Sequence, residues 1–170
     1  MAKKKKIDDT LPHVVIYTDG SYLASKDAGG CCAFVKFQDK NITVVYGESK
    51  TTNNRMELLA IIIGLNILIQ KCKVDIYSDS QYAINPFKDG YIHNWKRNGW
   101  KTSTKTPVKN QDLWNILVEL VARHDITFHW VKGHSSDEYN IYVDHVACEI
   151  SNNLKKYGFD QSDKIARKNK

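Results

Sequence analysis

The sequence contains few cysteines, and their spacing limits what the protein can be. Among 170 residues there are four, Cys31, Cys32, Cys72 and Cys148, and no two form a C-x-x-C pair. Cys31 and Cys32 are adjacent, so in a strand their side chains would point to opposite faces of the sheet. A zinc site is therefore not expected, and reduced, mostly buried thiols in a cytosolic protein fit better.

Long hydrophobic runs are also missing. No apolar stretch is long enough to cross a bilayer, so we expect no membrane partner. The first residues, MAKKKKIDDTLP, carry positive charge, but the apolar stretch of a secretory signal does not follow them. We therefore expect a cytoplasmic protein. Its length suits one domain with a substantial core.

Positive charge is unevenly distributed along the chain. The formal net charge is +6, and lysines are concentrated at both ends. Within the body, residues 88–109 hold six basic residues and one acidic residue, Asp89. A basic patch on an otherwise slightly acidic domain is typical of proteins that bind a polyanion. Solvated lysines without a partner would give the same local pattern.

Apolar periodicity and turn residues divide the chain into strands and helices. Strands are expected over residues 14–18, 29–37, 41–49, 73–79 and 125–134. Helices are expected over residues 53–72, 111–124 and about 138–156, with a weaker helical stretch after residue 79. The first of these helices is apolar almost all round, which predicts that it is largely buried.

The order of these elements predicts an α/β fold. Three consecutive strands suggest an antiparallel meander, and the later alternation of strand and helix requires parallel crossovers. We expect a mixed five-stranded sheet, with three antiparallel strands and two parallel additions, flanked by helices. The domain would cover residues 13–157, between a flexible basic arm (1–12) and a disordered basic tail (158–170).

Four carboxylates are candidates for one rim of this sheet. Asp19 and Asp79 follow the first and fourth strands, each flanked by small residues. Glu57 lies in the first turns of the long helix, and Asp144 lies near the start of the last one. Because the carboxyl ends of parallel strands meet at one rim, we expect these groups to converge there.

Each carboxylate also has an ordinary structural explanation. Asp19 followed by glycine is a strong turn signal. Glu57 could close a capping box on Asn54, and Asp79 could cap a helix. Asp144 could simply favour the positive end of its helix. Capping does not explain why several carboxylates should gather at one rim.

Clustered carboxylates repel one another, and a bound cation is the usual remedy. Oxygen ligands without cysteine or paired histidine favour Mg²⁺, with Mn²⁺ as the alternative. Two such ions can stabilise the attacking and leaving oxygens of a phosphodiester displacement.

Six motifs in this sequence are those of a known family: YTDGS, TTNNRMEL, SDSQY, IHNWKRNGWKT, PVKNQDLW and WVKGH followed by an aspartate. In order and spacing the chain resembles type 1 ribonuclease H over residues 13–156. The resemblance implies the ribonuclease H-like fold and an endonuclease that hydrolyses the RNA strand of RNA·DNA hybrids, leaving 3′-hydroxyl and 5′-phosphate ends. It implies two Mg²⁺ or Mn²⁺ ions with substrate, and we expect a monomer.

The resemblance also assigns the reacting centre. The metal-binding positions of the family fall on Asp19, Glu57, Asp79 and Asp144. His134 matches the family's mobile loop histidine, which assists proton transfer or product release, and Gly133 before it would serve as a hinge.

The substrate contacts implied by the resemblance divide between the two strands of the hybrid. On the RNA strand, 2′-hydroxyls and the minor-groove side would meet the residues Gly20, Ser21, Tyr22, Asn53 and Gln81. On the DNA strand, a phosphate pocket and two aromatic rings would come from Thr52 and Asn110, assisted by Lys50, and from Tyr82 and Tyr91. The basic protrusion that follows the backbone would include Trp95, Lys96, Arg97 and Lys101. In the alternative interpretation its tryptophans, with Trp100 and Trp114, are packing residues.

The chain departs from the family pattern at some positions. Ser25 stands where an asparagine is usual, and Tyr91 stands where tryptophan is common. Two other functions remain open. A non-catalytic hybrid-binding module would be favoured by the loss of a carboxylate, but all four are present. A ribonuclease H domain cut from a reverse transcriptase would share the basic protrusion; the short chain with polar tails favours a free-standing enzyme.

Overall fold

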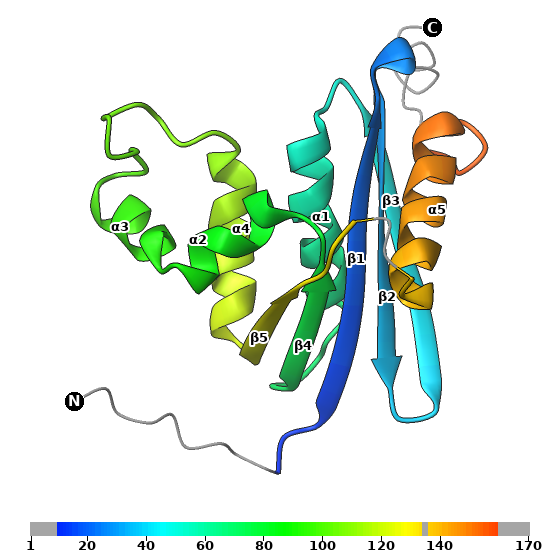
Figure 1. The fold of residues 1–170 in the computed structure, drawn as a ribbon, viewed down its shortest axis with the longest axis horizontal. Helices are drawn as coiled ribbons and strands as arrows, with labels where there is room; N and C mark the ends of the chain where they lie inside the picture. The colour runs from blue at the N-terminus through cyan, green and yellow to red at the C-terminus, as the bar shows by residue number, and fades with distance from the viewer. Residues whose placement is uncertain (1–9, 134–135, 160–170) are drawn as a thin grey trace, which may run out of the picture.

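The computed structural model describes residues 10–133 and 136–159. Five strands form one sheet in the spatial order β3-β2-β1-β4-β5 (Figure 1). Their bounds are β1 His13–Leu23, β2 Ala28–Phe37, β3 Lys40–Ser49, β4 Lys73–Ser78 and β5 Asp125–Trp130. The first three strands pair antiparallel, whereas β4 runs parallel to β1 and β5 parallel to β4. The predicted mixed sheet and its α/β class are confirmed.

Helices cover both faces of the sheet. Their bounds are α1 Asn53–Asn66, α2 Gln81–Lys88, α3 Tyr91–Arg97, α4 Gln111–Ala122 and α5 Glu138–Asn152, with a short 3₁₀ turn at Ala24–Lys26. Figure 1 shows α5 on one side of β1 and β2, and α1 with α4 on the other. Cys31 packs beside Met56 of α1, whereas Cys32 packs beside Val143 of α5. The two cysteines therefore point to opposite faces, as their adjacency predicts.

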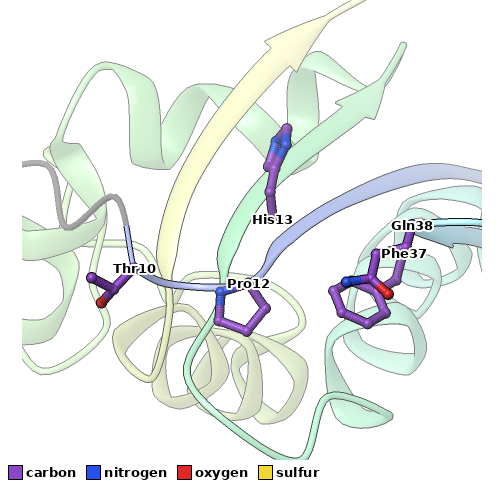
Figure 2. A pocket seen from close by; sticks show the side chains of 5 residues that line it. All are labelled: Thr10, Pro12, His13, Phe37 and Gln38. Atoms are coloured by element: carbon purple, nitrogen blue, oxygen red, sulfur yellow. The ribbon is translucent and has the colours of Figure 1, made fainter.

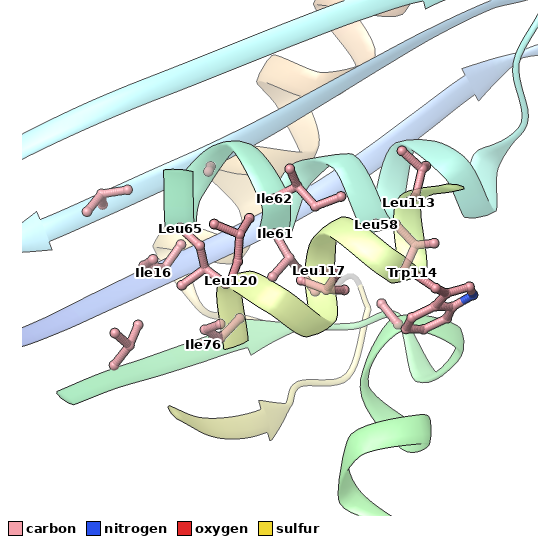
Figure 3. Close-up of a cluster of buried hydrophobic side chains, with 14 of the residues drawn as sticks. Ile16, Leu58, Ile61, Ile62, Leu65, Ile76, Leu113, Trp114, Leu117 and Leu120 are labelled. Atoms are coloured by element: carbon pink, nitrogen blue, oxygen red, sulfur yellow. The ribbon is translucent and has the colours of Figure 1, made fainter. Parts of the chain in front are cut away.

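The main core lies between the sheet, α1 and α4 (Figure 3). Ile16 of β1, Leu58 and Ile61 of α1, and Trp114 and Leu117 of α4 are all fully buried. Burying each side chain of this size stabilises the fold by about 1.5–3 kcal/mol. Helix α1 contacts β1 and β2 on one side and α4 on the other. This packing on two sides explains why apolar residues lie nearly all round the helix. Among the described residues, no helix combines the length and hydrophobicity needed to span a bilayer.

Several element ends differ from the sequence prediction. Helix α1 stops at Asn66 rather than residue 72, and Ile69 in the following connection is fully exposed. Strand β1 continues to Leu23 because it pairs with β2 beyond the last residue that β4 reaches. Strand β5 ends at Trp130, and α5 ends at Asn152. Helix α3 lies in the basic segment, to which the sequence analysis assigned no helix or strand.

On the α5 side of the sheet, a carboxylate lies between two histidines. Asp75 of β4 accepts hydrogen bonds from Nε2 of His13 at 2.5 Å and from Nε2 of His129 at 2.6 Å. The His129 ring stacks on Tyr77, whose ring stacks on Tyr17. These contacts join three neighbouring strands. Partial burial opposes ionisation of Asp75, but the hydrogen bonds from His129 and His13 lower the pKa of the carboxyl below its usual value.

Candidate active site

Three carboxylates from three different elements converge at the rim of the sheet. Asp19 of β1, Glu57 of α1 and Asp79 after β4 each offer an oxygen, and the three oxygens lie within 4.8 Å of one another. Tyr17 and Tyr77 are partners in the parallel β1–β4 pairing, so Asp19 and Asp79, each two residues further on, follow at the same level. Asp19 and Glu57 are each only 6% exposed.

The pair Asp19-Gly20 is not a turn, because β1 continues through it to Leu23. Gly20 has a steric role instead. A Cβ at this position would lie 2.4 Å from the Glu57 backbone nitrogen and 2.5 Å from the Met56 carbonyl carbon. Glycine therefore lets the backbone of α1 approach β1 closely enough to place Glu57 beside Asp19.

Other residues perform the capping that could have explained these carboxylates. The Thr52 side chain caps α1 by accepting from the Arg55 backbone N–H. Ser80 caps α2, and Asp137 caps α5. The interpretations of Glu57 and Asp79 as helix caps are therefore wrong, because neither occupies a cap position. Asp144 lies in the second turn of α5, beyond the first turn where the positive end of the helix acts.

Burial and mutual repulsion make the carboxylates unusually weak acids. Burial, with the charges of Asp79 and Asp144, raises the pKa of Asp19 to about 8, although the Gly20 N–H donates to its Oδ1 at 2.8 Å. Burial and the neighbouring Asp19 and Asp79 raise the pKa of Glu57 well above its usual value. Glu57 Oε2 is buried and has no hydrogen-bond partner among the described residues. A bound cation would offset the repulsion within such a cluster.

Asp144 lies close to this trio but outside its 4.8 Å limit. It sits in the second turn of α5, where the Cys148 thiol donates to its Oδ1 at 3.6 Å. Its charge contributes to the raised pKa of Asp19, which shows that the two carboxylates are neighbours. The structure thus brings three of the predicted carboxylates tightly together and leaves the fourth beside Asp19. His134 lies outside the described residues.

The residues predicted to meet the RNA strand lie around the carboxylates. Gly20, Ser21 and Tyr22 continue β1 beyond Asp19, and Ser21 Oγ lies 3.2 Å from the Ser151 hydroxyl of α5. Asn53 begins α1 and donates to Glu57 Oε1 at 3.3 Å. Gln81 begins α2 and is exposed, two residues after Asp79. Four of the five predicted residues therefore lie on β1 or α1, which carry Asp19 and Glu57. The fifth, Gln81, lies on α2, which begins just after Asp79.

An arginine that the sequence analysis did not single out contacts residues assigned to the predicted DNA-side pocket. Arg55 of α1 forms two hydrogen bonds with Asp112 of α4, at 2.9 and 3.0 Å, and reaches Asn110 Oδ1 at 3.4 Å. Asn110 in turn donates to the Tyr82 hydroxyl at 2.9 Å. Arg55 therefore joins the start of α1, where Thr52 lies, to the start of α4. Arg55 lies in the motif TTNNRMEL and Asp112 lies in PVKNQDLW. Their opposite charges in two recognised motifs were the sequence signal that could have suggested this ion pair.

The basic protrusion combines packed aromatic rings with exposed cations. Trp95 is half-buried and meets Trp114 edge-on, with ring centroids 5.5 Å apart, so its packing interpretation is correct. Lys96, Arg97 and Lys101 are exposed. A cavity of about 390 Å³ is lined by Tyr91, Trp95 and Lys101 among others, so these predicted residues share one hollow.

A second cavity, of about 470 Å³, lies at the opposite end of β1 (Figure 2). It is lined by Thr10, Pro12, His13, Phe37 and Gln38. None of these residues is a carboxylate, and β1 begins there and runs away toward Asp19. This cavity is therefore separate from the acidic rim.

Comparison with known proteins gives consistent matches. The family model described as RNase H matches residues 12–152. A Ribonuclease H of Rhodopseudomonas palustris (strain BisB5) is 48% identical over 134 residues, covering 79% of this chain and 89% of that one. A Ribonuclease H of Rhizobium meliloti (strain 1021) is 44% identical over 146 residues, covering 86% and 95% respectively. Among solved structures, LC9-RNase H1, titled a type 1 RNase H with the type 2 active-site motif, matches with a TM-score of 0.75 and 27% identity, over 86% of this chain and 75% of that chain.

Proposed function

The chain belongs to the ribonuclease H family, and we propose that it is a metal-dependent endonuclease that hydrolyses the RNA strand of RNA·DNA hybrids. The observation that carries this proposal is the trio Asp19, Glu57 and Asp79, in which the first two residues are buried and carboxylate oxygens of all three lie within 4.8 Å of one another. The products would be a 3′-hydroxyl and a 5′-phosphate.

The trio suits a hard divalent cation. Its donors are carboxylate oxygens, which Mg²⁺ and Mn²⁺ prefer. The raised pKa values of Asp19 and Glu57 and the unpartnered Glu57 Oε2 favour binding of positive charge. We assign Asp19, Glu57 and Asp79 as ligands, with Asp144 completing the set for a second ion when substrate is bound. The ions would stabilise negative charge on the attacking and leaving oxygens of the phosphodiester.

The remaining residues would position the hybrid. The backbone of Gly20, Ser21 and Tyr22, together with Asn53 and Gln81, would contact 2′-hydroxyls, which distinguish RNA from DNA. These contacts adjoin the carboxylates, so they would place the RNA strand, and not the DNA strand, at the reacting centre.

The opposite strand would be held from the other side of the site. Thr52 and Asn110 would bind a DNA phosphate, with Lys50 assisting, beside the rings of Tyr82 and Tyr91. The protrusion with Trp95, Lys96, Arg97 and Lys101 would follow the backbone further away, since phosphate contacts fix orientation without reading sequence. The connection between Asn110, Tyr82 and Arg55 supports one continuous DNA-side surface.

Three further assignments complete the proposal. His134 would assist proton transfer or product release. The protein would act as a monomer. It would work in a reducing compartment such as the cytoplasm, because all four cysteines are free and three of them are buried.

A cleavage assay with matched substrates tests the function. The protein is incubated with a labelled RNA·DNA hybrid, the same RNA single-stranded, and the same RNA in a duplex, with and without Mg²⁺. Cleavage of the hybrid alone, and only with Mg²⁺, is expected, and Asp79→Asn serves as the inactive control. Equal cleavage of duplex RNA would contradict the substrate assignment. Hybrid binding without any cleavage would indicate a non-catalytic binding module instead.

A further inference from the structure

The main chain around Asp79 is held on both sides by hydrogen bonds. The Val131 N–H donates to the Ser78 carbonyl at 3.0 Å, and the Trp130 indole Nε1–H donates to the Asp79 carbonyl at 3.0 Å. The Ser80 N–H donates to Ser78 Oγ at 3.1 Å, and Ser80 then caps α2. Because these bonds come from the end of β5, from the residue that follows it and from the N-cap of α2, the backbone of Asp79 cannot shift without breaking several of them.

Gly133, three residues beyond β5, faces the Asp79 side chain. A Cβ at position 133 would lie 2.8 Å from Asp79 Oδ2 and 3.7 Å from its Cγ. Its three nearest neighbours all belong to the Asp79 side chain. Among the described glycines, positive φ angles occur at Gly90, Gly99 and Gly158, and not at Gly133. Backbone conformation therefore does not require glycine at 133, whereas the space occupied by the carboxylate does.

We propose that Gly133 is a positioning residue that leaves room for the Asp79 carboxylate to reach Asp19 and Glu57. This inference rests on the proposed function of the trio as a metal site. A methyl group at 133 would displace the carboxylate rather than the backbone, since the terminal torsion of aspartate is soft while its main chain is hydrogen-bonded. The sequence alone suggests a hinge at this glycine; the contact with Asp79 gives it a different role.

The first test measures metal binding without substrate. Mn²⁺ and Mg²⁺ are titrated into wild type and Gly133→Ala, with calorimetry and the rise in melting temperature as readouts. The half-saturating metal concentration should increase roughly tenfold, as for other residues that orient metal ligands. Turnover on the hybrid should fall on the order of a hundredfold, because small displacements of catalytic groups are costly.

Gly90→Ala is the matched control for this titration. A Cβ at Gly90 meets nothing within 4 Å, and its φ is +76°, so alanine there costs only backbone conformation. Its melting temperature should fall while its half-saturating metal concentration equals that of wild type. If Gly133→Ala also binds metal as wild type does, the positioning role is overturned. If wild type binds no metal, the proposed metal site itself fails, which is a separate result.

The second test removes the carboxylate that Gly133 faces. Gly133→Ala is compared in the wild-type and Asp79→Ala backgrounds by metal-free thermal unfolding. With the carboxylate absent, the added methyl group has room, and alanine restricts the unfolded chain, so stability should be unchanged or slightly higher. With the carboxylate present, the change in melting temperature caused by Gly133→Ala should be lower by about 2 °C or more than the change it causes in the Asp79→Ala background. Equal effects in both backgrounds would show that the added methyl group does not meet the Asp79 carboxylate, and would overturn the proposal.

Discussion

Replacing Asp19 with asparagine should abolish cleavage and yet stabilise the metal-free protein. Asparagine keeps the shape of the side chain but removes the charge. Asp19 is 6% exposed, and its pKa is raised from 3.8 to about 8 by burial and by the charges of Asp79 and Asp144. Ionised Asp19 therefore opposes folding until a cation neutralises the cluster. Asp19→Asn should lose activity because it loses a metal ligand.

The size and pH dependence of the gain follow from the shift in pKa. Because the carboxyl is a weaker acid in the folded state, its destabilising effect is absent below 3.8 and grows until pH reaches about 8. Each pH unit in this window is worth about 1.4 kcal/mol, which gives an upper limit of about 4 kcal/mol at pH 7. The buried amide must find hydrogen bonds, so a net gain of about 1–3 kcal/mol is expected. For a chain of this length that corresponds to a rise of about 2–12 °C in melting temperature.

Thermal unfolding of wild type and Asp19→Asn, in a chelator at about pH 5 and about pH 8, measures this effect. The advantage of the variant should be larger at the higher pH. Added Mg²⁺ should raise the melting temperature of wild type and leave that of the variant nearly unchanged. Asp39→Asn, at the exposed β2–β3 turn and away from the trio, is the control and should not stabilise the protein. A melting temperature of Asp19→Asn at or below that of wild type at about pH 8 would refute the repulsion argument.

Three more perturbations test other parts of the molecule. Replacing Lys96, Arg97 and Lys101 together with alanine should raise KM with little change in kcat. The slope of log affinity against log salt concentration should become shallower by about one unit per lost phosphate contact. An unchanged slope would show that this surface does not meet the substrate. Asp75→Asn should cost about 1 kcal/mol at neutral pH, measured by urea unfolding. Because hydrogen bonds from its two histidine partners lower the pKa of the folded-state carboxyl, the difference should disappear as pH falls below 3.8, and a constant difference would exclude a stabilising role for these hydrogen bonds. Gly30→Ala should lower the free energy of unfolding by about 3 kcal/mol or more in the same assay, because the added Cβ would lie 2.5 Å from the Ala147 carbonyl oxygen of α5. A decrease of less than about 1 kcal/mol would mean that α5 can move away from the sheet.

The sequence by itself determined the class of fold and the identity of the candidate carboxylates. Period-two alternation, turn residues and the order of elements were enough to predict the mixed sheet, because they depend on neighbours along the chain. The same local logic placed Cys31 and Cys32 on opposite faces. Asp19 and Asp79 could be paired in advance, because parallel strands end at a common rim.

Element ends were predicted less well, since they depend on partners elsewhere in the chain. Strand β1 extends past Asp19 only because β2 supplies a second edge to pair with. Helix α1 stops at Asn66, and the chain then returns to begin β4 parallel to β1. Neither partner is visible in the local pattern around these residues.

Only the tertiary structure decided how close the functional groups lie. Gly20 sets the approach of α1, and through it the position of Glu57; Gly133 leaves the space for Asp79. In the sequence both glycines look like turn or hinge residues, because what they accommodate is a backbone or a side chain far away in the chain. The distances within the trio are thus set by contacts between elements, which periodicity and motif spacing do not encode.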